Sequence, residues 1–477
     1  MGGSRPVSEL IDKARAIVGA SHVLTGADAA PFGRDWTGKY ISSPAAVIRP
    51  ANTQEVSELV KACAAARTPI VPVSGNTGLA GGTFADGAIM ISLARMNAIR
   101  EIRSEARTAT IEAGAILSNI HDACDAHDLV FPLTFGARGS AMIGGALSTN
   151  AGGSNVVRYG NMRELCLGLE VVLPDGRIMD LMSQLRKDNT GYNLRQLMIG
   201  AEGTLGLITA AVLKLSPKPR AYATAMVACP SLSDALRLLN ALQEATGGAV
   251  EAFEYMPQAY IARHRAHFPQ ARAPFEDAYD VNILVEVGAT APRDATPEEN
   301  GEMPIVGYLE RVLGEMLERG EVLDAVVAKS EGQRREMWER REQAAEITLT
   351  TPNLVDTDVS VPLDQVATFL ELMTPAIAAL DREAQELAIA HLGDGNLHYT
   401  VYPSRDDAAL RDAMRKTVDE VVAGLGGSFS AEHGIGLTKL PSMQRNKDAV
   451  ALDIMRAIKT AIDPLNIMNP GKVVPRG

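Results

Sequence analysis

The sequence has few cysteines, and none of them forms a CxxC pair. The four stand far apart, at Cys63, Cys124, Cys166 and Cys229. This spacing argues against a disulfide framework and against a thiolate metal site. We therefore expect the cysteines to pack inside a protein of a reducing compartment. The sequence also lacks a Walker phosphate loop and a GxGxxG fingerprint, which excludes the usual nucleotide and dinucleotide motifs.

Long apolar runs are missing too. No stretch approaches the length needed to cross a membrane, and no basic segment followed by an apolar stretch marks a signal peptide near the N-terminus. The 477 residues carry a formal net charge of -12, which opposes binding to polyanions. We expect a cytoplasmic globular protein with no membrane span and no nucleic-acid partner.

The chain length predicts two or three packed domains. From about Pro44, short β-branched runs alternate with helical patterns, until two prolines within 215–219 interrupt the pattern. Long helical patterns at 231–246, 306–319 and 330–348 then alternate with strands, which suits an α+β domain with helices on one face of an antiparallel sheet. We assign residues 1–219 to a first domain with its core at about 44–219, residues 220–425 to a second domain, and residues 426–477 to a C-terminal segment.

Two glycine-rich stretches stand in the first domain. The first follows a predicted strand at 69–73 and contains Gly75, Gly78, Gly81 and Gly82; the second covers 136–153. Glycines at this density let the backbone approach a ligand closely and turn successive amides toward an anion. A diphosphate fits such loops, although glycines that only make tight turns are the alternative for either loop alone.

A third glycine cluster at 200–206 favours binding. The three stretches, with Asp188-Asn189-Thr190-Gly191-Tyr192, resemble the FAD domain of the vanillyl-alcohol oxidase/p-cresol methylhydroxylase superfamily. The resemblance implies a two-subdomain FAD-binding domain, an α+β cap domain with an antiparallel sheet, and a C-terminal helical segment. It also implies an extended FAD, which we expect to be non-covalent because the first loop has no histidine. The residues expected to bind FAD are Pro72, Ser74, Gly75, Asn76, Thr77, Gly78, Leu79, Pro132, Gly139, Ser140, Ile143, Gly144, Gly145, Thr149, Asn150, Gly152, Gly153, Glu202, Gly203, Gly206, Ile208 and Asn469.

A second motif has two apolar arms around Asp394-Gly395, the strongest short hairpin signal. If these two residues form the turn, His391 faces His398 across the strands. Directly opposed residues share one face of a sheet with Cβ atoms roughly 4.5 to 5.5 Å apart, so both imidazoles could bind one metal ion. Leu392 and Leu397 then turn to the other face and anchor the hairpin in the core. Asp394 is expected to serve the turn and not the metal.

Further along the chain, Glu432 stands beside His433 among glycines. Glu432 could complete a set of two histidines and one carboxylate that leaves coordination positions open, as a catalytic metal needs; a solvated loop glutamate is the alternative. With the hairpin and the tail at 463–472, this segment resembles the D-2-hydroxyacid dehydrogenase branch of the superfamily. That branch includes D-2-hydroxyglutarate dehydrogenases, D-lactate dehydrogenases and the glycolate oxidase flavin subunit. The resemblance implies His391, His398 and Glu432 as metal ligands, His433 as the catalytic base and Asn469 beside the flavin.

The function implied by this resemblance is the oxidation of a D-2-hydroxy acid to the 2-oxo acid by FAD with a divalent metal. The substrate hydroxyl and carboxylate would chelate the metal, His433 would accept the hydroxyl proton, and hydride would pass from C2 to flavin N5. Zinc suits a redox-silent Lewis acid, while manganese and ferrous iron also suit the ligand set.

Substrate choice depends on Arg341, in Trp338-Glu339-Arg340-Arg341, which resembles the arginine that holds the substrate carboxylate in this branch. A solvated helix arginine is the alternative. Two positions depart from the D-2-hydroxyglutarate pattern: Ala345 replaces a threonine, and Asp356 replaces a lysine just before the Asp-Val-Ser-Val-Pro strand. Because an anionic Asp356 would repel a distal carboxylate, we expect a monocarboxylic or distally polar substrate.

Other functions stay open at the level of sequence. The chain could be a flavin oxidase that uses oxygen, a metal-dependent hydrolase whose glycine loops are only structural, or a non-catalytic flavin-binding subunit. No motif identifies the electron acceptor, so an electron-transfer flavoprotein, a quinone and a cytochrome are all candidates. A homodimer is a candidate assembly.

Overall fold

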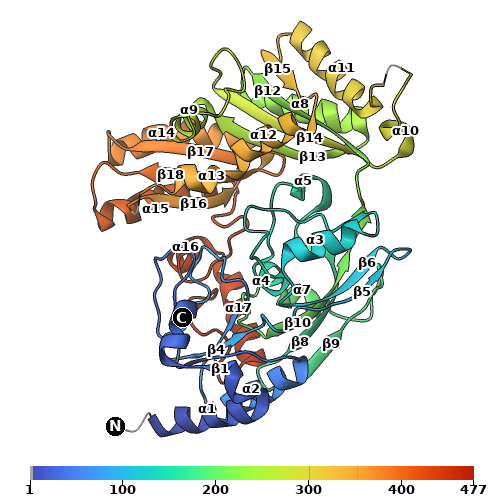
Figure 1. Ribbon diagram of the computed structural model, residues 1–477. Helices are drawn as coiled ribbons and strands as arrows, with labels where there is room; N and C mark the ends of the chain where they lie inside the picture. Colours follow the sequence, from blue (N-terminus) through green and yellow to red (C-terminus); the bar gives the residue numbers. More distant parts are fainter. Residues whose placement is uncertain (1–3, 300, 352, 477) are drawn as a thin grey trace.

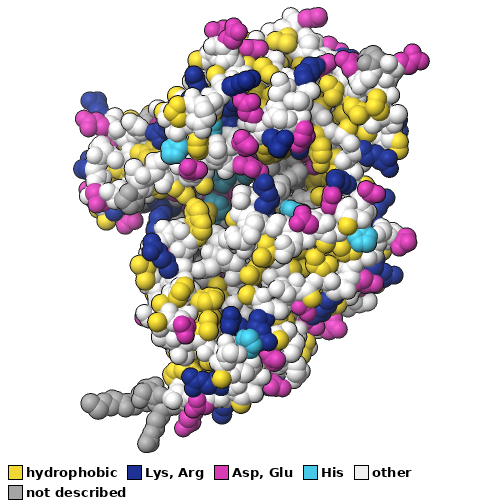
Figure 2. All heavy atoms as spheres, viewed as in Figure 1, with side chains coloured by type: hydrophobic (Ala, Val, Ile, Leu, Met, Phe, Trp, Pro, Cys, Tyr) yellow, Lys and Arg dark blue, Asp and Glu magenta, His cyan; other side chains and the backbone are white. Residues whose placement is uncertain are grey.

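The computed structural model describes residues 4–299, 301–351 and 353–476, and it has two lobes (Figure 1). The lower lobe holds both ends of the chain, and the upper lobe is built on one large sheet. A space-filling view shows histidine side chains in the hollow between the lobes (Figure 2). The fold is mixed α and β, with the antiparallel cap sheet that the sequence predicts.

The lower lobe begins with a four-stranded sheet in the order β1-β2-β4-β3, in which only β1 is antiparallel to its neighbour. Its strands are β1 (Val23–Leu24), β2 (Ala46–Ile48), β3 (Ile70–Val73) and β4 (Ile89–Ser92). Helices α1 (Ser4–Val18) and α2 (Thr53–Ala65) pack beside it. Asn52 caps α2 by accepting a hydrogen bond from the Glu55 amide at 2.9 Å.

A five-stranded antiparallel sheet completes the lower lobe, in the order β5-β6-β10-β8-β9. Its strands are β5 (Ile99–Arg103), β6 (Thr108–Glu112), β8 (Cys166–Val172), β9 (Ile178–Leu181) and β10 (Leu207–Lys214), and a separate pair joins β7 (Leu129–Val130) to β11 (Ser216–Pro217). The short helices around it are α3 (Leu117–Asp125), α4 (Ile143–Thr149), α5 (Val156–Tyr159), α6 (Met162–Leu165) and α7 (Leu194–Met198). The glycine-rich segments lie between these elements, except that the stretch 136–153 includes α4.

The upper lobe is a seven-stranded antiparallel sheet in the order β15-β12-β14-β13-β17-β18-β16. Its strands are β12 (Ala221–Cys229), β13 (Val250–Pro257), β14 (Val281–Ala289), β15 (Asp324–Val327), β16 (Val355–Ser360), β17 (Gln385–His391) and β18 (Asn396–Tyr402). Its helices are α8 (Leu232–Thr246), α9 (Gln258–His267), α10 (Pro292–Ala295), α11 (Pro304–Glu318), α12 (Glu331–Glu342), α13 (Ala344–Thr348), α14 (Val366–Leu380) and α15 (Ala408–Gly424). Single-turn 3-10 helices lie at Ala20–His22, Gly26–Asp28, Ala30–Gly33 and Leu363–Gln365.

Helices cover both faces of this sheet, so the expectation of helices on one face is wrong. Alternate strand residues point to opposite faces, and two separate apolar clusters form: one with α8, α11, α14 and α15, and one with α9, α12 and α13. The predicted helix at 330–348 is also two helices, because the backbone leaves the helical path at Gln343.

The C-terminal segment crosses back to the lower lobe through α16 (Leu440–Asn446) and α17 (Ala449–Ile462). Met468 bridges to Ile70 of β3, and the Asn469 amide donates to the Ile70 carbonyl at 2.7 Å. The tail therefore lies beside the strand that leads into the first glycine-rich loop.

Contrary to the expectation that no stretch approaches the necessary length, one segment, Leu363–Leu380, is long and apolar enough to cross a membrane by length and composition. It consists of a 3-10 turn and α14, which buries Val366, Phe369, Met373 and Ile377 against the sheet. We therefore interpret α14 as a core helix. All four cysteines are free and buried, as predicted.

Candidate functional site

The predicted hairpin forms, but its predicted register is wrong by two residues. His391 pairs with Asn396, and His398 pairs with Ile389, because the turn contains four residues and not two. The Gly393 amide donates to the Phe253 carbonyl, which draws the turn onto the neighbouring strand β13. Since a shift of two residues keeps the face of a strand, both histidines still share one face, with ring centroids 5.4 Å apart.

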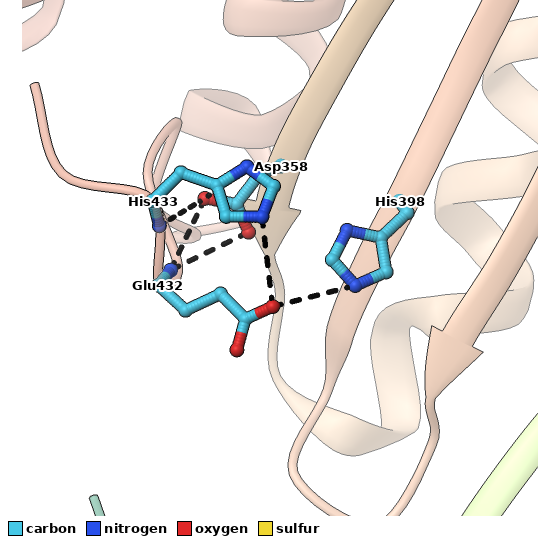
Figure 3. Close-up of side chains that lie close together, drawn as sticks. All are labelled: Asp358, His398, Glu432 and His433. Atoms are coloured by element: carbon cyan, nitrogen blue, oxygen red, sulfur yellow. Dashed lines mark hydrogen bonds and ion pairs between the residues drawn. The ribbon is translucent and has the colours of Figure 1, made fainter. Parts of the chain in front are cut away.

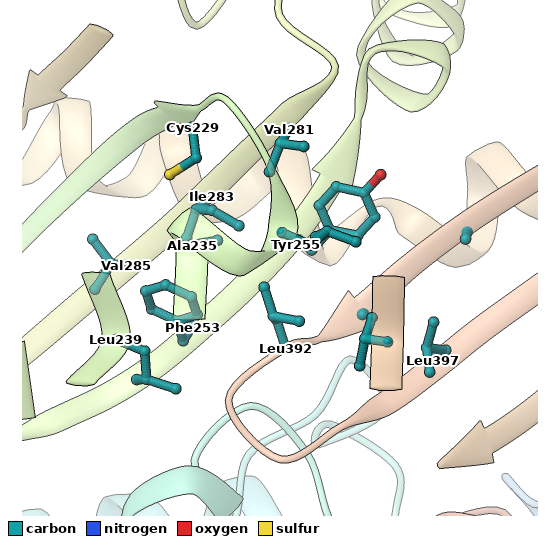
Figure 4. Packing of buried hydrophobic residues seen from close by; sticks show 14 of the residues in the cluster. Cys229, Ala235, Leu239, Phe253, Tyr255, Val281, Ile283, Val285, Leu392 and Leu397 are labelled. Carbon is teal, nitrogen blue, oxygen red and sulfur yellow. The ribbon is translucent and has the colours of Figure 1, made fainter. Parts of the chain in front are cut away.

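The two leucines anchor the hairpin as predicted. Leu392 and Leu397 are fully buried in the core of the upper lobe, where Figure 4 shows them beside Phe253. Asp394 serves the turn, because its carboxylate accepts a hydrogen bond from the Asn396 amide at 3.1 Å.

Glu432 lies at the centre of three imidazoles. Its Oε1 atom is 3.5 Å from His398 Nε2, 3.7 Å from His433 Nε2 and 3.9 Å from His391 Nε2. Figure 3 shows Glu432 and His433 on one loop, facing His398 on the strand β18. These distances all run from Glu432; the ligand atoms that lie within 4.8 Å of one another belong to Asp358, His398, Glu432 and His433. The structure thus brings together the three predicted metal ligands and the predicted base.

Asp358 belongs to the same cluster, although the sequence analysis did not identify it. Its carboxylate lies within 4.8 Å of ligand atoms on His398, Glu432 and His433, so proximity alone would make it a fourth ligand. However, its oxygens accept hydrogen bonds from the His433 amide at 2.9 Å, the Glu432 amide at 3.1 Å and Lys439 Nζ at 3.0 Å. We therefore assign Asp358 to holding the loop and not the metal.

A second unpredicted carboxylate, Glu254, is fully buried on β13. Its Oε1 lies 2.8 Å from His391 Nδ1, and its Oε2 forms an ion pair with Arg341 Nε at 2.7 Å. The neighbouring Arg340 instead donates to the Arg272 carbonyl. Of the two adjacent arginines, the structure therefore directs the predicted one, Arg341, toward the histidines.

Burial and neighbouring charges set the protonation of these groups. Burial holds the pKa of His398 well below its usual range, and the neighbouring His391 and His433 add to this effect. A neutral imidazole is the form that binds a metal. Burial opposes ionisation of Glu254, but His391 and Arg341 lower its pKa overall. His391 has a raised pKa, since the attraction of Glu254 outweighs its burial.

The segments predicted to bind FAD converge in the lower lobe. A Cβ atom on Gly75 would clash with the Ser140 carbonyl, and one on Gly203 would lie 2.7 Å from Pro72 Cγ. Asn469 Nδ2 donates to the Gly82 carbonyl at 3.0 Å and to the Glu202 carbonyl at 2.7 Å. Ile143, Gly144, Gly145 and Thr149 lie together on α4. All the glycine-rich segments and the tail therefore meet at one place.

The residues present fit a bound FAD. Among the described residues, none accepts a hydrogen bond from the backbone amides at 75–78, so these amides are free to bind an anion. Asn76, Asn150, Glu202 and Asn469 all have positive φ angles between 40° and 54°. Strained backbone of this kind clusters at ligand sites. The buried Oδ1 atom of Asn469 has no hydrogen-bond partner, which leaves an acceptor for a ligand.

Two contacts join the glycine-rich segments to the histidine cluster, which consists of Glu432 and the three histidines around it, His391, His398 and His433. A Cβ atom on Gly152 would lie 3.2 Å from Glu432 Oε2. Glu202 accepts hydrogen bonds from the Ile435 amide at 2.6 Å and the Gly436 amide at 2.8 Å, so its carboxylate holds the loop that carries Glu432. The predicted FAD region and the predicted metal site are therefore adjacent.

Other predicted residues lie further from this junction. Ile208 packs in the core of the lower lobe, and Pro132 is buried; their contact with FAD stays a prediction. Ala345 is exposed on α13, beyond the break at Gln343, and so it is not one turn along the helix of Arg341. Asp356 lies two residues before Asp358 on β16 and accepts a hydrogen bond from Thr400 Oγ1 at 3.0 Å.

The sequence contained one signal for the missed carboxylates. Glu254 and Asp358 are acidic residues inside the strands β13 and β16, at positions where the strand is buried on both faces. Charged residues are rarely buried unless they are paired. An acidic residue in such a strand therefore indicates a buried partner, but the sequence does not say which one.

Comparisons with known proteins agree with this geometry. Residues 44–182 match the FAD binding domain family, and residues 218–473 match the family of FAD linked oxidases, C-terminal domain. A D-2-hydroxyglutarate dehydrogenase of Stutzerimonas stutzeri is 33% identical over 476 residues, covering 97% of this chain and 98% of the relative. This chain belongs to the D-2-hydroxyacid dehydrogenase branch of the FAD linked oxidases. It is an FAD-dependent oxidoreductase.

Further relatives and solved structures extend the comparison of this FAD linked oxidase. The mitochondrial D-2-hydroxyglutarate dehydrogenase of Bos taurus is 35% identical over 448 residues, covering 92% of this chain and 79% of the relative. The fold is similar to substrate-bound p-cresol methylhydroxylase, with a TM-score of 0.74 at 16% identity over 98% of this chain and 97% of that one. The 4-ethylphenol oxidase of Gulosibacter chungangensis also has a TM-score of 0.74, at 18% identity over 99% and 98%. The predicted family branch and the predicted fold are confirmed.

Proposed function

We propose that this chain oxidises a D-2-hydroxy acid to the 2-oxo acid at a divalent metal held by His391, His398 and Glu432. The observation that carries the proposal is the position of Glu432 Oε1, which lies 3.5 to 3.9 Å from the Nε2 atoms of three histidines. The family supports the reaction class, since its relatives are D-2-hydroxyglutarate dehydrogenases. The ligand set leaves coordination positions open for a substrate.

Each residue has a separate task in this proposal. A divalent ion, with zinc favoured over manganese or iron, supplies a Lewis acid that lowers the pKa of the substrate hydroxyl. FAD supplies the acceptor for the hydride from C2. Arg341 holds the substrate carboxylate through the Nη atoms that its ion pair with Glu254 leaves available. His433 takes the hydroxyl proton. Its ring is stacked on the ring of the proposed ligand His398, with centroids 5.5 Å apart, so His433 lies beside the proposed metal site.

The experiment is anaerobic mixing of the purified flavoprotein with a panel of D- and L-2-hydroxy acids, followed by flavin absorbance. We expect D acids to bleach the flavin and L acids to leave it oxidised. Removal of the metal by a chelator should abolish bleaching, and added zinc or manganese should restore it. Bleaching that survives complete metal removal would contradict the metal-dependent mechanism. A flavin that stays oxidised with every acid would indicate a non-catalytic subunit, and rapid reoxidation by air with peroxide formation would indicate an oxidase.

For the substrate, we propose a 2-hydroxy acid without a distal carboxylate. Val359 of β16 points into the apolar core, so Asp356 and Asp358 point to the opposite face of the sheet. Asp358 pairs with His398 across the strands, so this is the face of the histidine cluster. A carboxylate on this face would repel a second carboxylate of the substrate. The proposed substrate therefore differs from the D-2-hydroxyglutarate named for the relatives, and the difference depends on Asp356.

Replacing Asp356 with lysine is therefore expected to raise kcat/KM for D-2-hydroxyglutarate. The repulsion is removed and a charge-assisted hydrogen bond becomes available, which corresponds to a gain of about 10- to 100-fold. Steady-state kinetics with D-2-hydroxyglutarate and D-lactate would measure it, with Asp364→Lys on the exposed 3-10 turn as the control for net charge. Equal gains in both variants, or strong turnover of D-2-hydroxyglutarate by the unmodified protein, would show that Asp356 does not select the substrate.

A further inference from the structure

The Glu254 carboxylate contacts two groups with different tasks. Its Oε1 lies 2.8 Å from His391 Nδ1, and its Oε2 lies 2.7 Å from Arg341 Nε. Glu254 itself is fully buried, and Arg341 and His391 are each 8% exposed. One buried carboxylate thus fixes the orientation of a predicted metal-site histidine and of the arginine beside it.

The contact with His391 also determines which ring nitrogen faces the cluster. The Nδ1 atom has Glu254 as its acceptor, so the proton belongs on Nδ1 and the lone pair lies on Nε2. Nε2 is the atom directed at Glu432, 3.9 Å away. Carboxylates that hold a histidine in this way raise its strength as a metal ligand.

The contact with Arg341 limits how the guanidinium can turn. Arg341 Nη2 lies 3.4 Å from both ring nitrogens of His391, so the guanidinium rests against the imidazole. The Glu254 carboxylate is the counter-charge of this guanidinium, so it offsets the cost of burying Arg341 against the imidazole. Without this carboxylate, the buried Arg341 would have no counter-charge, and neither Arg341 nor His391 would be held in its present orientation.

We propose that Glu254 is a positioning residue that couples substrate binding to metal binding, by fixing Arg341 and His391 with one carboxylate. This inference rests on the proposed function, since it assumes that His391 binds the metal and Arg341 the substrate. Loss of Glu254 should then weaken both affinities together. A carboxylate that only anchors α12 to the sheet would change neither affinity specifically.

The chain contains a matched control in Glu286. It lies on β14 next to β13, is 4% exposed, and pairs with Arg334 of the same helix α12 at 2.6 and 2.7 Å. Trp338 Nε1 and Thr224 Oγ1 also donate to it. Arg334 and Arg341 are two helical turns apart, so Glu286 and Glu254 anchor the same helix to the same sheet. Only Glu254 contacts the histidine cluster.

The test compares Glu254→Gln with Glu286→Gln in the FAD-loaded protein. Zinc affinity is measured by chelator competition. Substrate-site affinity is measured with oxalate, which reproduces the carboxylate and the adjacent oxygen of a 2-hydroxy acid, from its perturbation of the flavin spectrum. We expect Glu254→Gln to weaken zinc by about 10- to 100-fold and oxalate by about 10-fold or more, whereas Glu286→Gln leaves both close to the unmodified values.

Each outcome decides the inference. Equal losses in both variants would mean that the effect comes from anchoring α12, and loss of only one affinity would show that the two are not coupled. If Glu254→Gln does not fold, Glu254→Asp keeps the charge but is shorter by one methylene; unchanged affinities in that variant would overturn the inference. Failure of the unmodified protein to bind zinc or oxidise a hydroxy acid would instead refute the proposed function.

Discussion

Replacing His433 by glutamine is expected to lower kcat by about 10²- to 10⁴-fold, which is the usual contribution of a general base. Glutamine keeps hydrogen-bonding capacity but cannot accept the hydroxyl proton. His433 Nε2 lies 3.7 Å from Glu432 Oε1, close enough to reach a hydroxyl bound at the same metal. The rate of flavin reduction in anaerobic stopped flow measures the effect directly, because it reports the chemical step before reoxidation.

Metal content decides how this result is interpreted. If His433 is the base and not a ligand, His433→Gln should retain its zinc, which elemental analysis of the purified variant would show. Loss of zinc together with activity would make His433 a ligand and contradict its role as the base. His121→Gln is the control. His121 lies on α3 in the lower lobe, where it contacts the Leu133 carbonyl, so its replacement should change neither kcat nor zinc content.

The hairpin shows how far sequence reasoning reaches. Asp394-Gly395 predicted a two-residue turn, but the contact between Gly393 and β13 adds two residues to it. The conclusion that His391 and His398 share a face was still correct, because side chains repeat with a period of two along a strand. A local pattern therefore predicted the face, whereas the register depended on a strand more than a hundred residues away in the sequence.

The charged partners could not be predicted in the same way. Glu254 and His391 lie on β13 and β17, which become neighbours only in the folded sheet. Likewise, the link from Glu202 to the Ile435 amide joins the two lobes and has no local signature. The family resemblance identified the residues proposed to act on substrate, but the carboxylates that contact them come from strands that are neighbours only in the folded sheet.

Replacing Asp358 by asparagine is expected to destabilise the protein strongly. Asp358 is 1% exposed and Lys439 is 6% exposed, so the substitution leaves a buried ammonium without its counter-charge. Breaking a buried pair by removing one partner costs about 3 to 5 kcal/mol in the free energy of unfolding. Urea unfolding followed by circular dichroism measures this loss. In the control Asp419→Asn, the partner Arg445 keeps a side chain that is 38% exposed, so its charge stays solvated and the loss should be smaller.

A double variant separates stability from function at Asp358. Removing both charges in Asp358→Asn/Lys439→Met should recover much of the lost stability, since no unpaired charge remains buried. Zinc affinity should stay low, because the amides of Glu432 and His433 no longer share a carboxylate acceptor that holds their loop against β16. Recovery of both stability and zinc affinity would show that the charge pair, and not the amide contacts, sets the geometry of the site. Recovery of stability alone would assign to Asp358 the placement of the ligand Glu432 and the base His433.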